Sequence, residues 1–224
     1  AFKECTSLIS ITIPDSVTSI GRGVFYKCSS LTRVTIPDRV ASVGRLAFKE
    51  CTSLISITIP DSVTSIGSYA FEACTSLTSI TIPDSVTSIG EYTFFKCTNL
   101  ASVTFGDNSQ LTSIGANAFY QCPLKRITIP ASVNNIGDYA FEQCSLDSVY
   151  FSGNAPSFGD VVFDRNPNVR VFTKPDASGF NESIDGIQIL SVLYAQSFNG
   201  YASEITDLND GSVITGDNVS VTNG

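Results

Sequence analysis

Cysteine is the chemically reactive residue with the most regular spacing in this 224-residue chain. The seven cysteines, separated by 23, 23, 23, 23, 25 and 22 residues, are Cys5, Cys28, Cys51, Cys74, Cys97, Cys122 and Cys144. Such thiols could pair as disulfides, bind a metal ion or stay buried and reduced. The column continues to Asn166, because F-D-R-N has the register of F-E-Q-C at 141–144. Asn cannot form a disulfide, so we expect buried free thiols that hydrogen-bond the backbone. No C-x-x-C occurs, and we expect no metal site.

The composition argues against an enzyme. The chain contains no His, so it has no Ser-His-Asp or Cys-His pair, and no motif positions two of its carboxylates together. We therefore expect no catalytic residue and no cofactor. The net charge of −8 argues against a nucleic-acid partner, because phosphate binding needs clustered Lys and Arg. No apolar stretch reaches the roughly 18–20 residues that a membrane helix needs.

Aromatic side chains are the first candidate binding residues. Tyr69, Tyr92 and Tyr139 share one position of the repeated pattern, and Phe95 and Tyr120 share another. We expect these five residues to form a ligand-binding patch, since aromatic anchors are enriched in binding hot spots. The alternative is that they cover the apolar residues beneath them.

Hydroxyl side chains are the second candidate, because they form a column at a regular spacing. The column consists of Thr12, Thr35, Thr58, Thr81, Thr104, Thr128 and then Tyr150. Thr is a soluble residue that favours strands, which is the structural interpretation. A flat array of hydroxyl groups could also bind a glycan or ice. Interruption of the neighbouring column by Arg33 and Arg126 argues against both ligands.

These candidates are carried by an internal repeat. Residues 1–21 and 47–67 are the same string, AFKECTSLISITIPDSVTSIG, and a two-residue insertion breaks the period near 106–110. The segment I-T-I alternates with period two and is ended by Pro, as in a strand. V-T-S-I-G is a second short extended segment, and the A-F segment is too short for more than one helical turn. One such coil cannot bury its own apolar face, so stacked coils must share a core. The sequence therefore predicts a mainly β solenoid with a parallel sheet.

The pattern L-x-x-I-x-I-P-x-x-V-x-x-I-G-x-x-A-F-x-x-C resembles the BspA-like class of leucine-rich repeats, found in bacterial and protist surface proteins. Seven successive coils keep the pattern, from residue 1 to about 175. The resemblance implies a right-handed leucine-rich-repeat coil with its parallel sheet on the concave face and short extended or one-turn helical segments elsewhere. It implies no catalytic residue.

A change of composition near residue 175 predicts two regions. Residues 1–175 form the solenoid, with about seven coils and an incomplete first coil, since the chain opens within the repeat. We expect earlier coils or another packed segment before it. Residues 176–224 contain seven acids and no base, and form a cap or an acidic β-rich tail. Within this region, 184–194 predicts one or two strands that close the core, and 212–222 resembles a hairpin. Whether 195–224 belongs to the cap or begins another module is left open.

Two functional hypotheses follow. The first is a non-catalytic interaction module of a larger cell-surface or secreted protein. The family resemblance implies adhesion, with a protein or glycan on another cell or in the matrix as the partner. The second is a structural spacer without a ligand, which the near-identical coils favour. The interaction module is the primary hypothesis, and the spacer is the alternative.

Overall fold

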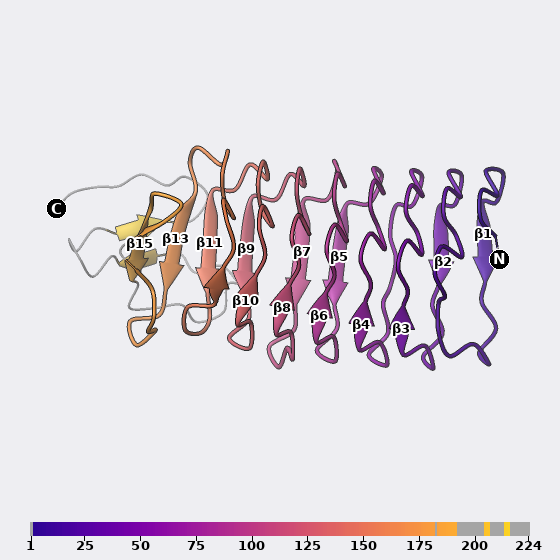
Figure 1. The fold of residues 1–224 in the computed structure, drawn as a ribbon, viewed down its shortest axis with the longest axis horizontal. Coiled ribbons are helices and arrows are strands. Elements are labelled where there is room, and N and C mark those ends of the chain that lie inside the picture. Colours follow the sequence, from indigo (N-terminus) through magenta and orange to yellow (C-terminus); the bar gives the residue numbers. More distant parts are fainter. Residues whose placement is uncertain (1, 182, 192–203, 207–212, 216–224) are drawn as a thin grey trace.

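The chain folds into an elongated stack of coils (Figure 1). The structure is a computed structural model that describes residues 2–181, 183–191, 204–206 and 213–215. Each coil adds one turn of chain to the stack, and none of the residues in these ranges is helical. The predicted mainly β solenoid is therefore confirmed.

The first face of the stack is built from the I-T-I segments. Its strands are β1 (Ser10–Thr12), β2 (Arg33–Thr35), β5 (Ser79–Ile82), β7 (Ser102–Phe105), β9 (Arg126–Ile129), β11 (Ser148–Phe151), β13 (Arg170–Thr173) and β15 (Ile187–Ser191). These strands form three parallel, in-register ladders, β1–β2, β5–β7 and β9–β11–β13–β15, so that Ile80 is paired with Val103. Alternating residues point into the core, which places Thr81 outward between buried Ile80 and Ile82.

A second parallel sheet runs along the stack from the V-T-S-I-G segments. Its six strands are β3 (Ser42–Val43), β4 (Ser65–Ile66), β6 (Ser88–Ile89), β8 (Ser113–Ile114), β10 (Asn135–Ile136) and β12 (Ser157–Phe158). The sequence predicts the extended segments but not their pairing between coils. Each segment ends at a Gly, which has no side chain and so lets the backbones of neighbouring coils lie close together. A Cβ on Gly67, for example, would lie 2.7 Å from the backbone N of Arg45 in the preceding coil.

The core between these faces consists of columns of identical or similar residues. The Phe column is the most regular, with successive ring centroids 5.1 to 5.6 Å apart and nearly parallel rings. Its members are Phe2, Phe25, Phe48, Phe71, Phe94, Phe119, Phe141 and Phe163. All of them except Phe2 are buried. Each coil thus completes the packing of its neighbours, as expected for a solenoid.

The A-F segments form tight turns that stack along a third side of the molecule. Two residues of each turn have positive φ, such as Tyr69 at 62° and Ala73 at 56°, so the backbone cannot continue as an α-helix. Backbone bonds join each turn to the next, for example from the N–H of Phe71 to the carbonyl of Thr93. We call this side the turn face: residues 21–27, 44–50, 67–73, 90–96, 115–121, 137–143 and 159–165.

The two-residue insertion interrupts the first sheet only. β5 and β7 form one sheet, whereas β9, β11, β13 and β15 belong to another, so the ladder is broken between β7 and β9. On the turn face the bonding continues across the same coils, from the N–H of Tyr92 to the carbonyl of Ala116. The insertion therefore changes the sheet side and leaves the turn face regular.

The C-terminal region extends the stack beyond residue 175. β15 pairs in parallel with β13, while β14 (Ser183–Ile184) pairs antiparallel with β15. Ile187 and Ile189 pack against the core, which confirms the predicted closing strands in 184–194. Within 212–222, β17 (Val213–Thr215) pairs antiparallel with β16 (Glu204–Thr206), and the predicted hairpin of β17 with the segment after it stays a prediction. Residues 216–222 lie outside the described ranges. The division at 175 stays a prediction.

Candidate functional site

The cysteine column is structural. From Cys28 to Cys144, each thiol donates a hydrogen bond to the carbonyl oxygen of the core Phe in the preceding coil, at 2.9 to 3.2 Å. The same Phe carbonyl accepts the backbone N–H of the Cys in its own coil, as with Phe25 and Cys28. All seven cysteines are free, which confirms that the column is not a disulfide framework.

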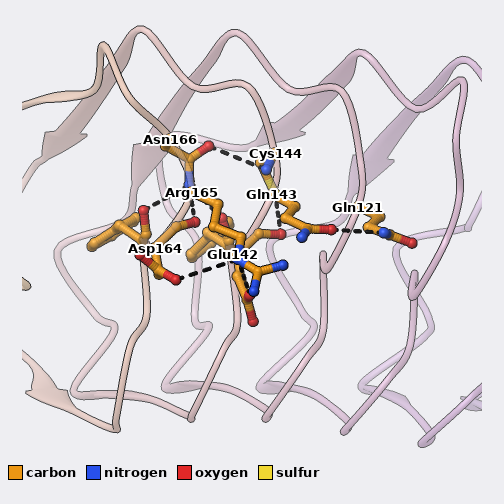
Figure 2. Close-up of polar contacts among 9 residues, drawn as sticks. Gln121, Glu142, Gln143, Cys144, Asp164, Arg165 and Asn166 are labelled. Carbon is orange, nitrogen blue, oxygen red and sulfur yellow. Dashed lines mark hydrogen bonds and ion pairs between the residues drawn. The ribbon is translucent and has the colours of Figure 1, made fainter.

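Asn166 replaces the thiol at the end of this column (Figure 2). Its Nδ2 donates to the carbonyl of Phe141 at 2.9 Å, which is the bond that a Cys would make. Its Oδ1 accepts the backbone N–H groups of Cys144 and Leu146 at 3.1 and 2.9 Å. The prediction that this position holds a small buried group bonded to the backbone is confirmed.

Burial makes most of these thiols unreactive. Desolvation raises the pKa of Cys51 to about 12, and it raises the pKa values of Cys74 and Cys122 well above the ordinary range. The prediction that the thiols are buried fails for Cys5, which is exposed. Cys5 lies in the first coil, and no described coil packs against the outer surface of that coil. Within the described ranges, no group of three or more His, Cys, Asp or Glu is arranged to hold a metal ion.

Four of the five predicted aromatic residues form a continuous row of rings on the turn face. Tyr69 stacks on Tyr92 with centroids 4.9 Å apart, Tyr92 meets Phe95 edge-on at 5.3 Å, and Phe95 stacks on Tyr120 at 5.0 Å. These four residues, here called the aromatic strip, are all half-buried. Tyr139 is 40% exposed and lies two coils beyond Tyr92, outside this row.

The backbone at the Tyr column is strained. Tyr69, Tyr92 and Tyr139 have φ values of 62°, 56° and 57°, in the left-handed region that side-chain-bearing residues seldom adopt. Gly23 and Asn117, which tolerate this region better, occupy the same column, and so do Leu46 and Val161 with φ values of 62° and 54°. The left-handed backbone is therefore a property of the turn in every coil. The sequence pattern shows the shared position but not its left-handed backbone.

Cations lie over the rings of the turn face. The guanidinium carbon of Arg45 is 5.0 Å from the ring centroid of Tyr69, and Nζ of Lys96 is 5.0 Å from that of Phe95. Lys49 lies between the Tyr69 ring, at 5.7 Å, and Glu72, to which it forms an ion pair of 2.8 Å. The strip is therefore a row of rings with charged edges, a composition typical of protein-binding surfaces.

The broken sheet leaves a hollow of about 850 Å³ between β7 and β9. Its polar lining includes Thr104, Thr128, Tyr150, Arg126 and Lys174. The hydroxyl column changes character here: Thr12 to Thr81 are exposed, Thr104 and Thr128 are half-buried, and Tyr150 is buried. The insertion was visible in the sequence, but the hollow depends on how the inserted residues fold.

The comparisons with known proteins agree with the repeat. The BspA type leucine rich repeat region matches residues 1–110 and 108–185 in six copies. No curated protein matches the chain at a significant level. Within the described residues, no helix has the length and apolar character to cross a membrane.

Several solved structures are similar to the chain. The leucine-rich repeat protein TpLRR of T. pallidum is 34% identical, with a TM-score of 0.61, over 67% of this chain and 73% of that one. A leucine rich cell surface protein from Faecalibacterium prausnitzii is 38% identical, with a TM-score of 0.57, over 86% of this chain and 44% of that one. The pneumococcal vaccine antigen PcpA shares the fold at 24% identity, with a TM-score of 0.55, over 64% of this chain and 40% of that one.

Proposed function

Because this chain belongs to the BspA-type leucine-rich repeat family, we propose that it is a non-catalytic, protein-binding module of a cell-surface or secreted protein. The similarity to a leucine rich cell surface protein of F. prausnitzii supports the location. The family of repeats is generally non-catalytic. Adhesion through a partner on another cell or in the matrix is the role we propose.

The observation that carries this proposal is the aromatic strip. The core columns are nearly invariant, so they cannot distinguish one partner from another, whereas the strip occurs only in coils around Tyr92. The left-handed backbone of Tyr69 and Tyr92 does not add to this argument, because every turn has it at this position, Leu46 and Val161 included. We place the partner over this strip, with the exposed Tyr139 as a peripheral contact.

The test is a double variant, Phe95→Ser with Tyr120→Ser, screened against arrays of surface proteins and glycans beside the unmodified chain. Central aromatic anchors lose about 2 kcal/mol or more of binding free energy on truncation. We therefore expect a partner of the unmodified chain to bind the variant at least about thirtyfold more weakly, with a nearly unchanged melting temperature. Tyr26→Ser is the matched control, because Tyr26 shares the sequence position of Phe95 but lies outside the strip.

Tyr92→Asn separates packing from binding. Asn117 occupies the same column with a φ of 55°, so Asn fits the turn. This variant should remain as stable as the original and lose binding. If the double variant is less stable by several degrees yet binds normally, the strip is packing and the proposal is overturned. A chain that binds neither an array member nor a second copy of itself would favour the structural spacer.

The hollow supports a second candidate function, glycan binding. Hydroxyl groups, a Tyr and two cations converge there, a combination that suits a sugar carrying a carboxylate. Lys174→Glu should abolish binding of acidic oligosaccharides on the same arrays and leave protein partners of the strip unaffected. Unchanged binding of acidic oligosaccharides by this variant would rule the hollow out.

A further inference from the structure

The turn face carries a charge gradient along the stack. The position directly after the Gly of each coil is occupied in order by Arg22, Arg45, Ser68, Glu91, Ala116, Asp138 and Asp160. All five charged members of this column are exposed. Its two bases therefore lie at one end of the stack and two of its acids, Asp138 and Asp160, at the other, with Glu91 in the middle.

The whole turn face shows the same gradient, and the net charges of its two ends are equal in size and opposite in sign. Residues 21–27 and 44–50 contain four bases and one acid, a net charge of +3. Residues 137–143 and 159–165 contain four acids and one base, a net charge of −3. The base at the acidic end is Arg165, which pairs with Glu142 and Asp164 (Figure 2).

Both ends are equally far from the centre of the aromatic strip. The turns with Arg45 and Asp138 each lie two coils from the turn with Tyr92 and Phe95, and those with Arg22 and Asp160 lie three coils from it. The backbone ladder holds this register: the carbonyls of Arg45, Glu91, Asp138 and Asp160 each accept a bond from the preceding coil, from Gly23, Tyr69, Asn117 and Tyr139. At about 4.8 Å per coil, the inner charges lie about 10 Å on either side of the strip centre.

We propose that the turn face binds a second copy of this chain, antiparallel, about a twofold axis through the coil of Tyr92 and Phe95. Rotation about such an axis puts Arg45 opposite the partner's Asp138 and Arg22 opposite the partner's Asp160, twice in each dimer. The central rings of the two copies meet at the axis. This inference rests on the proposed function, since it names the partner of the same strip.

Charge complementarity selects a second copy over other partners. A uniformly acidic partner would be repelled by the Asp138 and Asp160 end, and a uniformly basic one by the Arg22 and Arg45 end. A copy turned end for end satisfies both ends at once. In the column after the Gly, Glu91 meets its own image at the axis, so this residue should weaken the contact.

Sedimentation of two charge-reversed variants tests the proposal. The first is Arg22→Glu with Arg45→Glu, and the second is Asp138→Arg with Asp160→Arg. Each alone places like charges opposite each other, and its self-association should weaken by about tenfold or more. A one-to-one mixture restores every opposed pair, so the heterodimer should form about as tightly as the original dimer. Glu91→Gln should tighten the dimer, and added salt should weaken it.

Controls keep these outcomes distinct. Arg33→Glu with Arg39→Glu makes the same change of charge outside the turn face, and should leave association unchanged. Because Asp138 accepts the backbone N–H of Asp160, a second acidic-end variant, Asp160→Arg with Asp164→Arg, serves if the first unfolds. A chain that stays monomeric, or folded variants that fail to associate when mixed, would overturn self-association. Binding of an array protein lost in Phe95→Ser with Tyr120→Ser would then still support the protein-binding function.

Discussion

The buried cysteines act as hydrogen-bond donors within the core. Each thiol bonds to the carbonyl of a Phe in the preceding coil, and Asn166 makes the same bond where the column ends. Asn could replace Cys because both supply a small donor to one buried acceptor. The signal for this role was present in the sequence, since a column that accepts Asn cannot depend on disulfides.

Alkylation of the native protein should distinguish the exposed thiol from the buried ones. Cys5 is exposed, whereas the other six cysteines are buried. A thiol reagent should therefore modify Cys5 alone in the native state and all seven cysteines after denaturation without reductant. Mass spectrometry would count the labels. Three disulfides and one free thiol would contradict the structure.

The buried thiols should also make stability depend on pH. Burial raises the pKa of Cys51 from 9.0 to about 12. In the unfolded chain this thiol loses its proton near pH 9, so above that pH the unfolded state binds fewer protons. The stabilising contribution is therefore complete below pH 9 and is lost as the pH rises from 9 to 12. Urea titrations in reductant should show a smaller decrease for Cys51→Ser, and an equal decrease would exclude Cys51 as a source.

The second sheet depends on the glycine at the end of each of its strands. Gly67 follows β4, and a side chain there would approach the backbone of Arg45 in the coil before it. Backbone cannot move aside as a flexible side chain can, so Gly67→Ala should destabilise the protein by about 1–3 kcal/mol. Gly186→Ala is a useful contrast, since a Cβ there would contact nothing within 4 Å, although its φ of 77° adds local strain. Denaturant midpoints would compare them, and an unchanged midpoint for Gly67→Ala would mean that the coils can separate.

The elements were predictable to different degrees. The 23-residue period gives the coil, its strand and its core columns, because the same residues must face the same neighbours in every coil. Pairing of the V-T-S-I-G segments is a contact between coils, and two-residue strands carry no clear period of their own. The aromatic strip could be predicted from the shared positions of its residues. The left-handed backbone of Tyr92 and the hollow beside the insertion could not, since both depend on the folded turn geometry.

The whole molecule behaves as a one-dimensional array in which each coil contacts its neighbours. Phe94 stacks between Phe71 and Phe119 and is fully buried, whereas Phe2 stacks on Phe25 alone and is 41% exposed. Phe94→Ala should therefore cost about 3–5 kcal/mol. Phe2→Ala should cost far less, because little packing is lost at the end of the stack. Thermal unfolding would measure both, and equal losses would contradict the nearest-neighbour description.

The bonding between coils also determines how the molecule responds to force. Strand pairs and the backbone bonds of the turn face join neighbouring coils, so tension along the stack loads these hydrogen bonds one coil at a time. A coil of 23 residues that detaches adds about 70 Å of extended chain in place of about 4.8 Å of stack. Successive small ruptures would dissipate work while the remaining coils stay folded. A surface protein built in this way would lengthen in flowing liquid before its contact with a partner is pulled apart.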